Sequence, residues 1–89
     1  MIINVINFGD FLMSHPAGRE AFLLAQAYIF KTLKKDEDII LDFNGIKVLG
    51  PSWADEFIQG IKANYPNEIK YINTYNPSVS ASLETVLSD

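Results

Sequence analysis

Serine, histidine and acidic side chains are the residues of this sequence with the clearest potential for chemistry. His15 is the only histidine, and Ser14 and Ser52 are candidate nucleophiles. A serine hydrolase would need His15 to take the serine proton, with an acid to orient the ring. Neighbours in sequence rarely form such a triad, and the chain lacks the G-x-S-x-G turn of one hydrolase class. We therefore predict no catalytic residue and keep a hydrolase that uses His15 as an alternative.

The same inventory argues against a metal or cofactor. The chain has one histidine, no cysteine and only scattered carboxylates, so it lacks the ligand sets of common metal sites. Glycine-rich motifs that hold phosphates or dinucleotides are also missing. We expect no cofactor, no metal and no disulfide.

The segment SWADE, residues 52–56, places a serine and two acids at the predicted start of a helix. The S-x-x-D spacing fits a capping box, in which Ser52 caps the helix and Asp55 reaches back to the N–H of Ser52. Asp55 and Glu56 also suit the positive end of the helix dipole. The same position presents a hydroxyl where free N–H groups favour phosphate. Ser52 is therefore both a candidate cap and a candidate phospho-switch.

Trp53 is the only tryptophan and lies in the first turn of this predicted helix. Two interpretations remain open. An inward ring would make Trp53 a core residue, whereas an exposed ring beside Ser52 would make it an anchor for a protein partner. We keep Trp53, Asp55 and Glu56 as candidate partner-binding residues.

Arg19 lies near the predicted start of the first helix, where the helix dipole disfavours a positive charge. A salt bridge to Asp55 or Glu56 would compensate it, and an anion site near the strand ends is the alternative. In open parallel sheets, ligands gather at the carboxyl ends of the strands. We therefore expect Arg19 and His15 to share one edge of the domain with Ser52 and Asp55, as further candidates for partner binding.

Three predicted strands alternate with three predicted helices in the elements that position these residues. Apolar and β-branched runs predict strands at residues 2–6, 38–43 and 68–73. Capping residues and helical periodicity predict helices at about 16–33, at 52–65 and from 77 onward, with Ser14 and Asn76 as caps. The β-α-β-α-β-α order predicts a small single α/β domain over residues 1–89, with a mostly parallel sheet and packed helices.

The run DIILDF at residues 38–43 is continuously apolar between two acids, which is typical of a central strand covered on both faces. The dipeptide NG at 44–45 could signal a hairpin, with residues 46–49 as a returning strand. Because the next helix begins a few residues later, we prefer a loop at 44–49.

The first predicted helix carries more apolar residues than one buried face requires. On a helical wheel, Leu24 and Tyr28 fall beside Ala17 and Ala21, away from the side that would face the sheet. Either a second packing surface buries them or they form an exposed apolar patch. We keep Leu24 and Tyr28 as a candidate dimer patch.

Composition restricts the class of protein further. The 89 residues are 48% hydrophobic and 20% charged, which is typical of a globular domain. With 7 basic and 11 acidic residues, the net charge of −4 argues against direct nucleic-acid binding and leaves a basic partner open. No apolar run reaches the ~20 residues that span a bilayer, and the first residues do not resemble a secretory signal. We expect no membrane partner and a cytoplasmic location.

Three segments carry a resemblance to a known family: FLMSHPAGREAF at 11–22, IILDFNGIKVLGPSWADEF at 39–57 and INTYNPSV at 72–79. Together they resemble the STAS-like domain of unknown function found in bacterial proteins and their mobile elements. That family is related to the sulphate-transporter and anti-sigma-factor-antagonist domains. The resemblance implies a non-enzymatic α/β module that binds protein partners, often switch kinases, under control of serine phosphorylation.

The resemblance also implies a position for the phosphorylated serine. In the antagonist domains this serine stands in a D-S-S-G motif, after a central strand and at the start of a helix. Aligned by strand and helix, it falls on Ser52. Gly50, Pro51 and Trp53 stand where the motif has aspartate, the first serine and glycine. The acceptor position is shared, and the rest of the motif is not.

These observations lead to three functional hypotheses. The first is a regulatory protein-interaction module without catalysis, which binds a kinase-like ATPase or another regulator and uses Ser52 as a candidate switch. The second is a small acidic inhibitor from a mobile element that blocks a nucleic-acid-binding protein. The third is the hydrolase that uses His15. A homodimer through Leu24 and Tyr28 is compatible with the first hypothesis.

Overall fold

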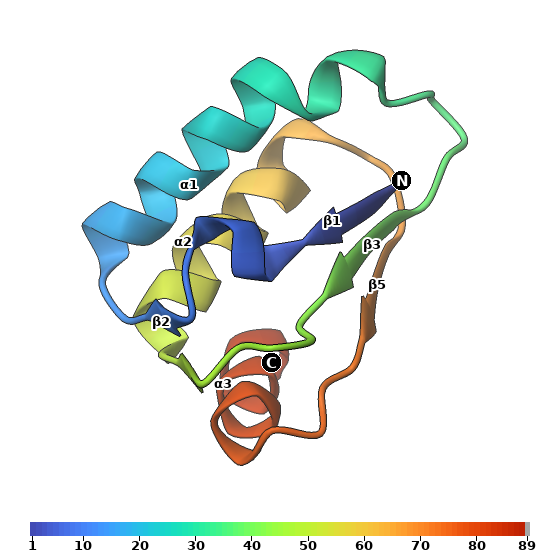
Figure 1. Cartoon of the computed structure of the whole chain (residues 1–89). Coiled ribbons are helices and arrows are strands. Elements are labelled where there is room, and N and C mark those ends of the chain that lie inside the picture. The colour runs from blue at the N-terminus through green and yellow to red at the C-terminus, as the bar shows by residue number, and fades with distance from the viewer. Residues whose placement is uncertain (89) are drawn as a thin grey trace.

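A computed structural model describes residues 1–88 of the chain. The main sheet is parallel, in the order β1-β3-β5, and a short parallel pair, β2-β4, extends the fold at one end (Figure 1). The strands are β1 (Ile2–Asn4), β2 (Phe11–Leu12), β3 (Ile39–Asp42), β4 (Val48–Leu49) and β5 (Ile69–Ile72). The helices of residues 1–88 are α1 (His15–Tyr28), α2 (Pro51–Asn64) and α3 (Pro77–Leu87). The predicted small α/β domain with a mostly parallel sheet is confirmed.

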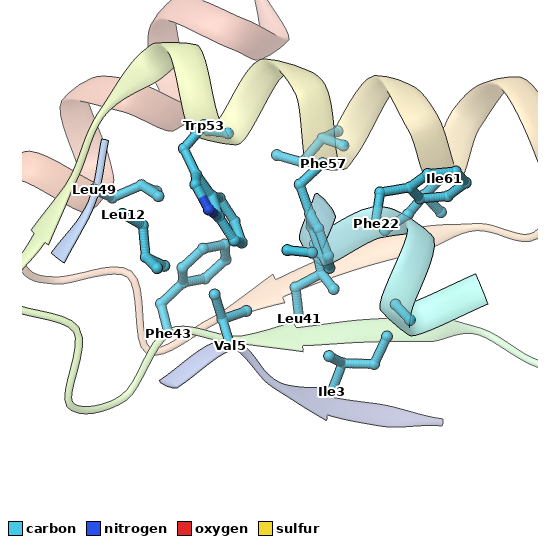
Figure 2. Close-up of a cluster of buried hydrophobic side chains, with 14 of the residues drawn as sticks. Ile3, Val5, Leu12, Phe22, Leu41, Phe43, Leu49, Trp53, Phe57 and Ile61 are labelled. Atoms are coloured by element: carbon cyan, nitrogen blue, oxygen red, sulfur yellow. The ribbon is translucent and has the colours of Figure 1, made fainter. Parts of the chain in front are cut away.

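The buried face of the sheet is built by alternate residues of the strands. Ile3, Leu41 and Tyr71 are paired in register across β1, β3 and β5. Ile3 and Leu41 are fully buried and Tyr71 is half-buried. Successive side chains of a strand point to opposite faces, so this row and Ile39 face the helices. In Figure 2, Ile3 and Leu41 point from the strands toward Phe57 of α2.

The opposite face of the sheet is open to solvent, which corrects the prediction that residues 38–43 are covered on both sides. Ile2 is 60% exposed and Ile72 is 39% exposed, while Ile40 and Asp42 between them are half-buried. The prediction failed because α3 does not cross this face. It packs instead against α2 and β4 at one end of the sheet (Figure 1).

Local sequence signals set most helix starts. The Ser14 hydroxyl accepts a hydrogen bond from the N–H of Ala17, and Asn76 accepts from two N–H groups in the first turn of α3, so both predicted caps are confirmed. Proline stands in the first turn of each helix, where its missing N–H costs nothing. The end of the first helix was predicted too late. α1 stops at Tyr28, and a 3-10 turn, η2 (Phe30–Thr32), follows.

The segment before α2 also differs from the prediction. Val48–Leu49 is a strand, where we preferred a loop, and it pairs in parallel with Phe11–Leu12 and does not turn back as a hairpin. The first strand is shorter than predicted, because the 3-10 turn η1 (Val5–Phe8) follows Asn4. This turn carries the chain from the main sheet to β2. The two short strands place the starts of α1 and α2 side by side, because each helix begins two or three residues after its strand.

The two helices over the sheet approach each other at glycines. A Cβ atom on Gly18 of α1 would lie 2.5 Å from the carbonyl oxygen of Trp53 in α2. A Cβ on Gly60 of α2 would lie 2.7 Å from the ring of Phe22 in α1. Both distances are shorter than a carbon side chain tolerates. Close helix packing therefore requires glycine at position 60 of α2, and Gly18 is its counterpart on α1.

Candidate functional site

The starts of α1 and α2 and the last turns of α3 border an open depression of about 260 Å³. We call it the rim depression. Its lining residues come from all three helices and are His15, Pro51, Ser52, Asp55, Thr85 and Val86. The structure thus brings together three residues predicted to share one edge of the domain, His15, Ser52 and Asp55. Thr85 and Val86 were not predicted, because the sequence does not reveal which helix face meets α2.

Ser52 does not cap α2, which corrects the capping-box prediction. The N-cap is Gly50, and no side chain caps the helix there. Pro51 begins the helix, so Ser52 and Asp55 both lie within its first turns. Within residues 1–88 the Ser52 hydroxyl has no hydrogen-bond partner, and the residue is half-buried and lines the depression. The hydroxyl is therefore accessible near the unpaired N–H groups at the start of a helix.

His15 and Glu56 lie opposite each other in this region, and their contact is an ion pair only when the imidazole is protonated. Nδ1 of His15 lies 3.5 Å from Oε1 of Glu56, and both side chains are at least one-third exposed. An exposed pair of this kind contributes between 0 and about 1 kcal/mol to stability. A hydrolase would also need a bond between His15 and Ser52, and residues 1–88 contain no such hydrogen bond. The geometry thus supplies one of the two contacts that a triad requires.

Arg19 does not form the predicted salt bridge and is not among the residues that line the rim depression. Its guanidinium carbon lies 5.7 Å from the centre of the Phe22 ring, in a cation–π contact. Within the described chain no carboxylate lies within salt-bridge distance of Arg19, so the expected bridge to Asp55 or Glu56 is wrong. The reason is that His15, one turn earlier, occupies the position opposite Glu56.

Trp53 is a core residue, which corrects its place among the partner-binding candidates. It is 2% exposed and stacks on Phe57, with 4.9 Å between ring centres. Figure 2 shows the indole pointing from α2 toward Phe43 and Val5. Trp53, Phe57 and Ile61 are spaced by four residues and are all buried, so Trp53 lies on the face of α2 that packs on the core.

A second polar cluster lies at the carboxyl ends of β3 and β5. Oδ1 of Asp42 accepts hydrogen bonds from the side-chain amide of Asn73 and from the N–H of Asn44, each at 2.9 Å. The Tyr75 hydroxyl donates to the Asn44 side chain at 3.0 Å. Hydrogen bonds from Asn73 and then from Asn44 favour the ionised carboxylate and lower the pKa of Asp42. These three hydrogen bonds join the loop after β3 to the loop after β5.

The two residues of the candidate dimer patch are exposed, which agrees with the interpretation that they form an apolar surface patch. Leu24 is 47% exposed and Tyr28 is 76% exposed. The nearby Ala21 is buried and Ala17 is exposed. The second packing surface that could have buried Leu24 and Tyr28 is therefore not present in residues 1–88.

Among residues 1–88, no three histidine, aspartate or glutamate side chains gather as a metal-binding group. Over the same residues, no helix combines the length and the apolar character that crossing a membrane requires.

The fold and the position of the rim depression define a class: a small α/β domain whose helices start where short parallel strands end. Comparison with known proteins identifies the family within this class. The family model described as STAS-like domain of unknown function matches residues 27–79, more than half of the chain. The chain belongs to this family. Searches of curated proteins and of solved structures found no match.

Proposed function

We propose that this chain is a regulatory protein-interaction module without catalytic activity, which binds its partner at the rim depression. The observation that carries the proposal is Ser52, a half-buried residue whose hydroxyl has no hydrogen-bond partner within residues 1–88, in a depression that three helices border. Membership of the STAS-like family supports the same reading. Binding sites commonly lie where a rigid frame presents polar groups at the ends of its elements.

The polar residues of the depression suggest how the partner is recognised. Asp55 lies in the lining, and Glu56 beside it is held by His15. This carboxylate pair gives the surface a negative character, in keeping with the net charge of −4. A protein partner with basic side chains opposite Asp55 therefore fits the charge of the site. The partner class that we propose is a kinase-like ATPase or another regulator.

Ser52 is the proposed switch within this site. A phosphate on its hydroxyl would add −1.5 to −2 charges beside the unpaired N–H groups of the first turn of α2. Those N–H groups favour the phosphate, whereas Asp55 and Glu56 repel it. Phosphorylation would therefore change the charge of the depression while leaving the fold in place, and a partner that reads Asp55 would bind differently.

The proposal is tested with a charge reversal at the depression and a matched reversal elsewhere. Asp55→Lys changes the lining, and Asp36→Lys makes the same change in an exposed turn outside the depression. Partners captured from host cells are quantified by mass spectrometry and then tested as purified proteins by calorimetry. We expect Asp55→Lys to weaken binding at least tenfold, by analogy with charged contacts at other interfaces, and Asp36→Lys to bind as the parent does.

Two measurements separate this function from its rivals. Equal binding by both lysine variants would contradict a partner site at the depression. Intact mass of the protein from its host, with and without phosphatase, reports whether Ser52 carries phosphate, with Ser52→Ala as the control. A hydrolytic activity that His15→Ala abolishes would instead favour the hydrolase hypothesis.

A further inference from the structure

A second hollow lies on the other side of α1, between this helix and the segment that leads into β2. Its volume is about 320 Å³. The lining residues are Asn7, Phe8, Phe11, Leu12, Ala17, Glu20, Ala21, Leu24 and Trp53. None of them lines the rim depression. We call this hollow the α1 groove.

Apolar residues make up most of the lining of the α1 groove, and Asn7 and Glu20 are its polar residues. Phe11 is 62% exposed and Leu24 is 47% exposed, so large apolar groups face solvent on both sides of it. Glu20 is its acidic lining residue, and the small side chains of Ala17 and Ala21 leave space beside α1. The groove therefore accepts a bulky, mainly apolar side chain next to a positive charge.

A side chain of this kind stands on the same helix, two turns further along. Tyr28 is 76% exposed, and the ammonium of Lys31 lies 5.9 Å from the centre of its ring. Glu20, Leu24 and Tyr28 are spaced by four residues and follow one face of α1. Tyr28 lies about 12 Å from Glu20 along the helix axis, at 1.5 Å per residue.

We propose that the chain forms a two-fold homodimer in which α1 packs antiparallel against α1 of a second copy, with the axis at Leu24. A two-fold interface requires a surface that is complementary to itself, with each knob and its hole on opposite sides of the axis. Leu24 is the midpoint between Glu20 and Tyr28. In the dimer, Leu24 meets its symmetry mate, and each Tyr28 enters the α1 groove of the other copy.

Charge complementarity is the reason to assign a second copy as the occupant. The antiparallel arrangement brings Lys31, which accompanies Tyr28, to Glu20 of the other copy. The interface thereby contains two Lys31–Glu20 pairs, one on each side of the axis. Two whole chains of charge −4 repel each other, but at this contact the charges are balanced. A single pair of 14-residue helices buries an area at the low end of specific interfaces, so we expect a dissociation constant in the micromolar range.

The first test is sedimentation velocity of the full chain between 1 μM and 1 mM, with far-UV circular dichroism to verify folding of every variant. We expect the sedimentation coefficient to rise with concentration from monomer to dimer. Glu20→Lys or Lys31→Glu alone should weaken association at least fivefold, and the double exchange should restore it. Recovery of association in the double variant would be specific to the Glu20–Lys31 pairing, because nonspecific apolar association would not depend on exchanging these two charges.

The second test locates the symmetry axis. The chain has no cysteine, so a single introduced thiol is unambiguous. Leu24→Cys should be joined to its own copy by a short thiol-specific crosslinker, because residues at a two-fold axis meet themselves. Ile2→Cys, exposed on the open face of the sheet, is the matched control and should react far more slowly.

Three results would overturn the dimer. One is a monomer throughout the concentration range. Another is association that survives in Glu20→Lys and is not altered by Lys31→Glu. The third is crosslinking through Ile2→Cys in place of Leu24→Cys, which would place the contact on the sheet face.

Discussion

The role of Ser52 follows from the two residues that precede it. Gly50 takes the N-cap position and Pro51 begins α2, so the serine enters the helix and its hydroxyl is released from capping. At α1 the order is different, because Ser14 precedes the helix and its hydroxyl is used as the cap. A shift of two positions relative to the N-cap thus separates a serine that caps its helix from one that does not.

Asp42 offers a prediction at the same scale. The hydrogen bond from Asn73 is the largest cause of its lowered pKa. Asn73 has a positive φ of 55°, which asparagine and glycine tolerate better than other residues. Asn73→Gly therefore removes the donor and keeps the backbone conformation. We expect the pKa of Asp42, measured by NMR titration of its carboxyl carbon, to rise toward the ordinary value of about 3.9.

The sign of the linked stability change follows from that direction. A carboxyl whose folded pKa lies below its unfolded value stabilises the protein above the unfolded pKa and loses this contribution as the pH falls through the folded pKa. Asp42 and Glu37, whose pKa is lowered by the N–H of Lys34 and then by the terminal ammonium, both act in this sense. Asn73→Gly should thus reduce the loss of stability below about pH 4. An unchanged Asp42 titration would show that Asn73 does not control it.

At the scale of the elements, the contact between α1 and α2 determines the shape of both candidate sites. Gly18 and Gly60 allow the helices to approach closely, and this approach places His15 opposite Glu56. The side of α1 that is turned away from α2 carries Leu24 and Tyr28. One helix packing therefore positions the rim depression on one side of α1 and leaves the α1 groove on the other.

The two glycines differ in the atoms that oppose them, which gives a prediction. Gly18→Ala meets the backbone of Trp53, which cannot move without displacing α2. We expect it to lower the free energy of unfolding by about 1–3 kcal/mol, even though alanine is the better helix former. Gly60→Ala meets the ring of Phe22, a side chain that a second substitution can make smaller. Urea denaturation followed by circular dichroism measures both effects.

A double-mutant cycle separates the two cases. Phe22→Leu removes the ring, so it should recover part of the loss caused by Gly60→Ala and almost none of the loss caused by Gly18→Ala. The exposed Gln59→Ala on α2 is the control for helix propensity and should change stability little. Equal coupling of Phe22→Leu to both glycine variants would contradict this packing.

At the scale of the whole molecule, one contiguous core joins all three helices to the sheet. Buried residues from α1, α2 and α3 belong to the same cluster as those of β1 and β3. The buried hydroxyl of Ser82 in α3 donates to the carbonyl of Leu49 in β4. The third helix is therefore connected to the rest by an apolar contact and by a hydrogen bond.

A core of this kind predicts cooperative unfolding. Trp53 is the only tryptophan and is buried, so its fluorescence reports on the core, while circular dichroism reports on the helices. The two urea transitions should coincide, as expected of a two-state domain. Ser82→Ala should move both midpoints together and reduce stability by about 1–2 kcal/mol. A shift seen by circular dichroism alone would mean that α3 unfolds by itself.

Much of the fold could be predicted from local sequence. The caps at Ser14 and Asn76 and the apolar runs of β3 and β5 act within a few residues of the chain, so their signals survive without knowledge of distant contacts. The alternation of these elements then predicted the parallel α/β arrangement. The start of α2 was predicted at residue 52 and lies at Pro51.

Only the tertiary structure determined which way side chains point and which distant segments contact each other. The pairing of the two-residue strands β2 and β4 depends on residues 37 positions apart, and so short a run carries almost no periodicity of its own. The rotation of α2 buried Trp53, and the position of α3 left one face of the sheet open. His15, and not Arg19, met Glu56 because the crossing of two helices chooses which side chains touch. Sequence spacing alone cannot specify that choice, since it depends on contacts between segments that fold together.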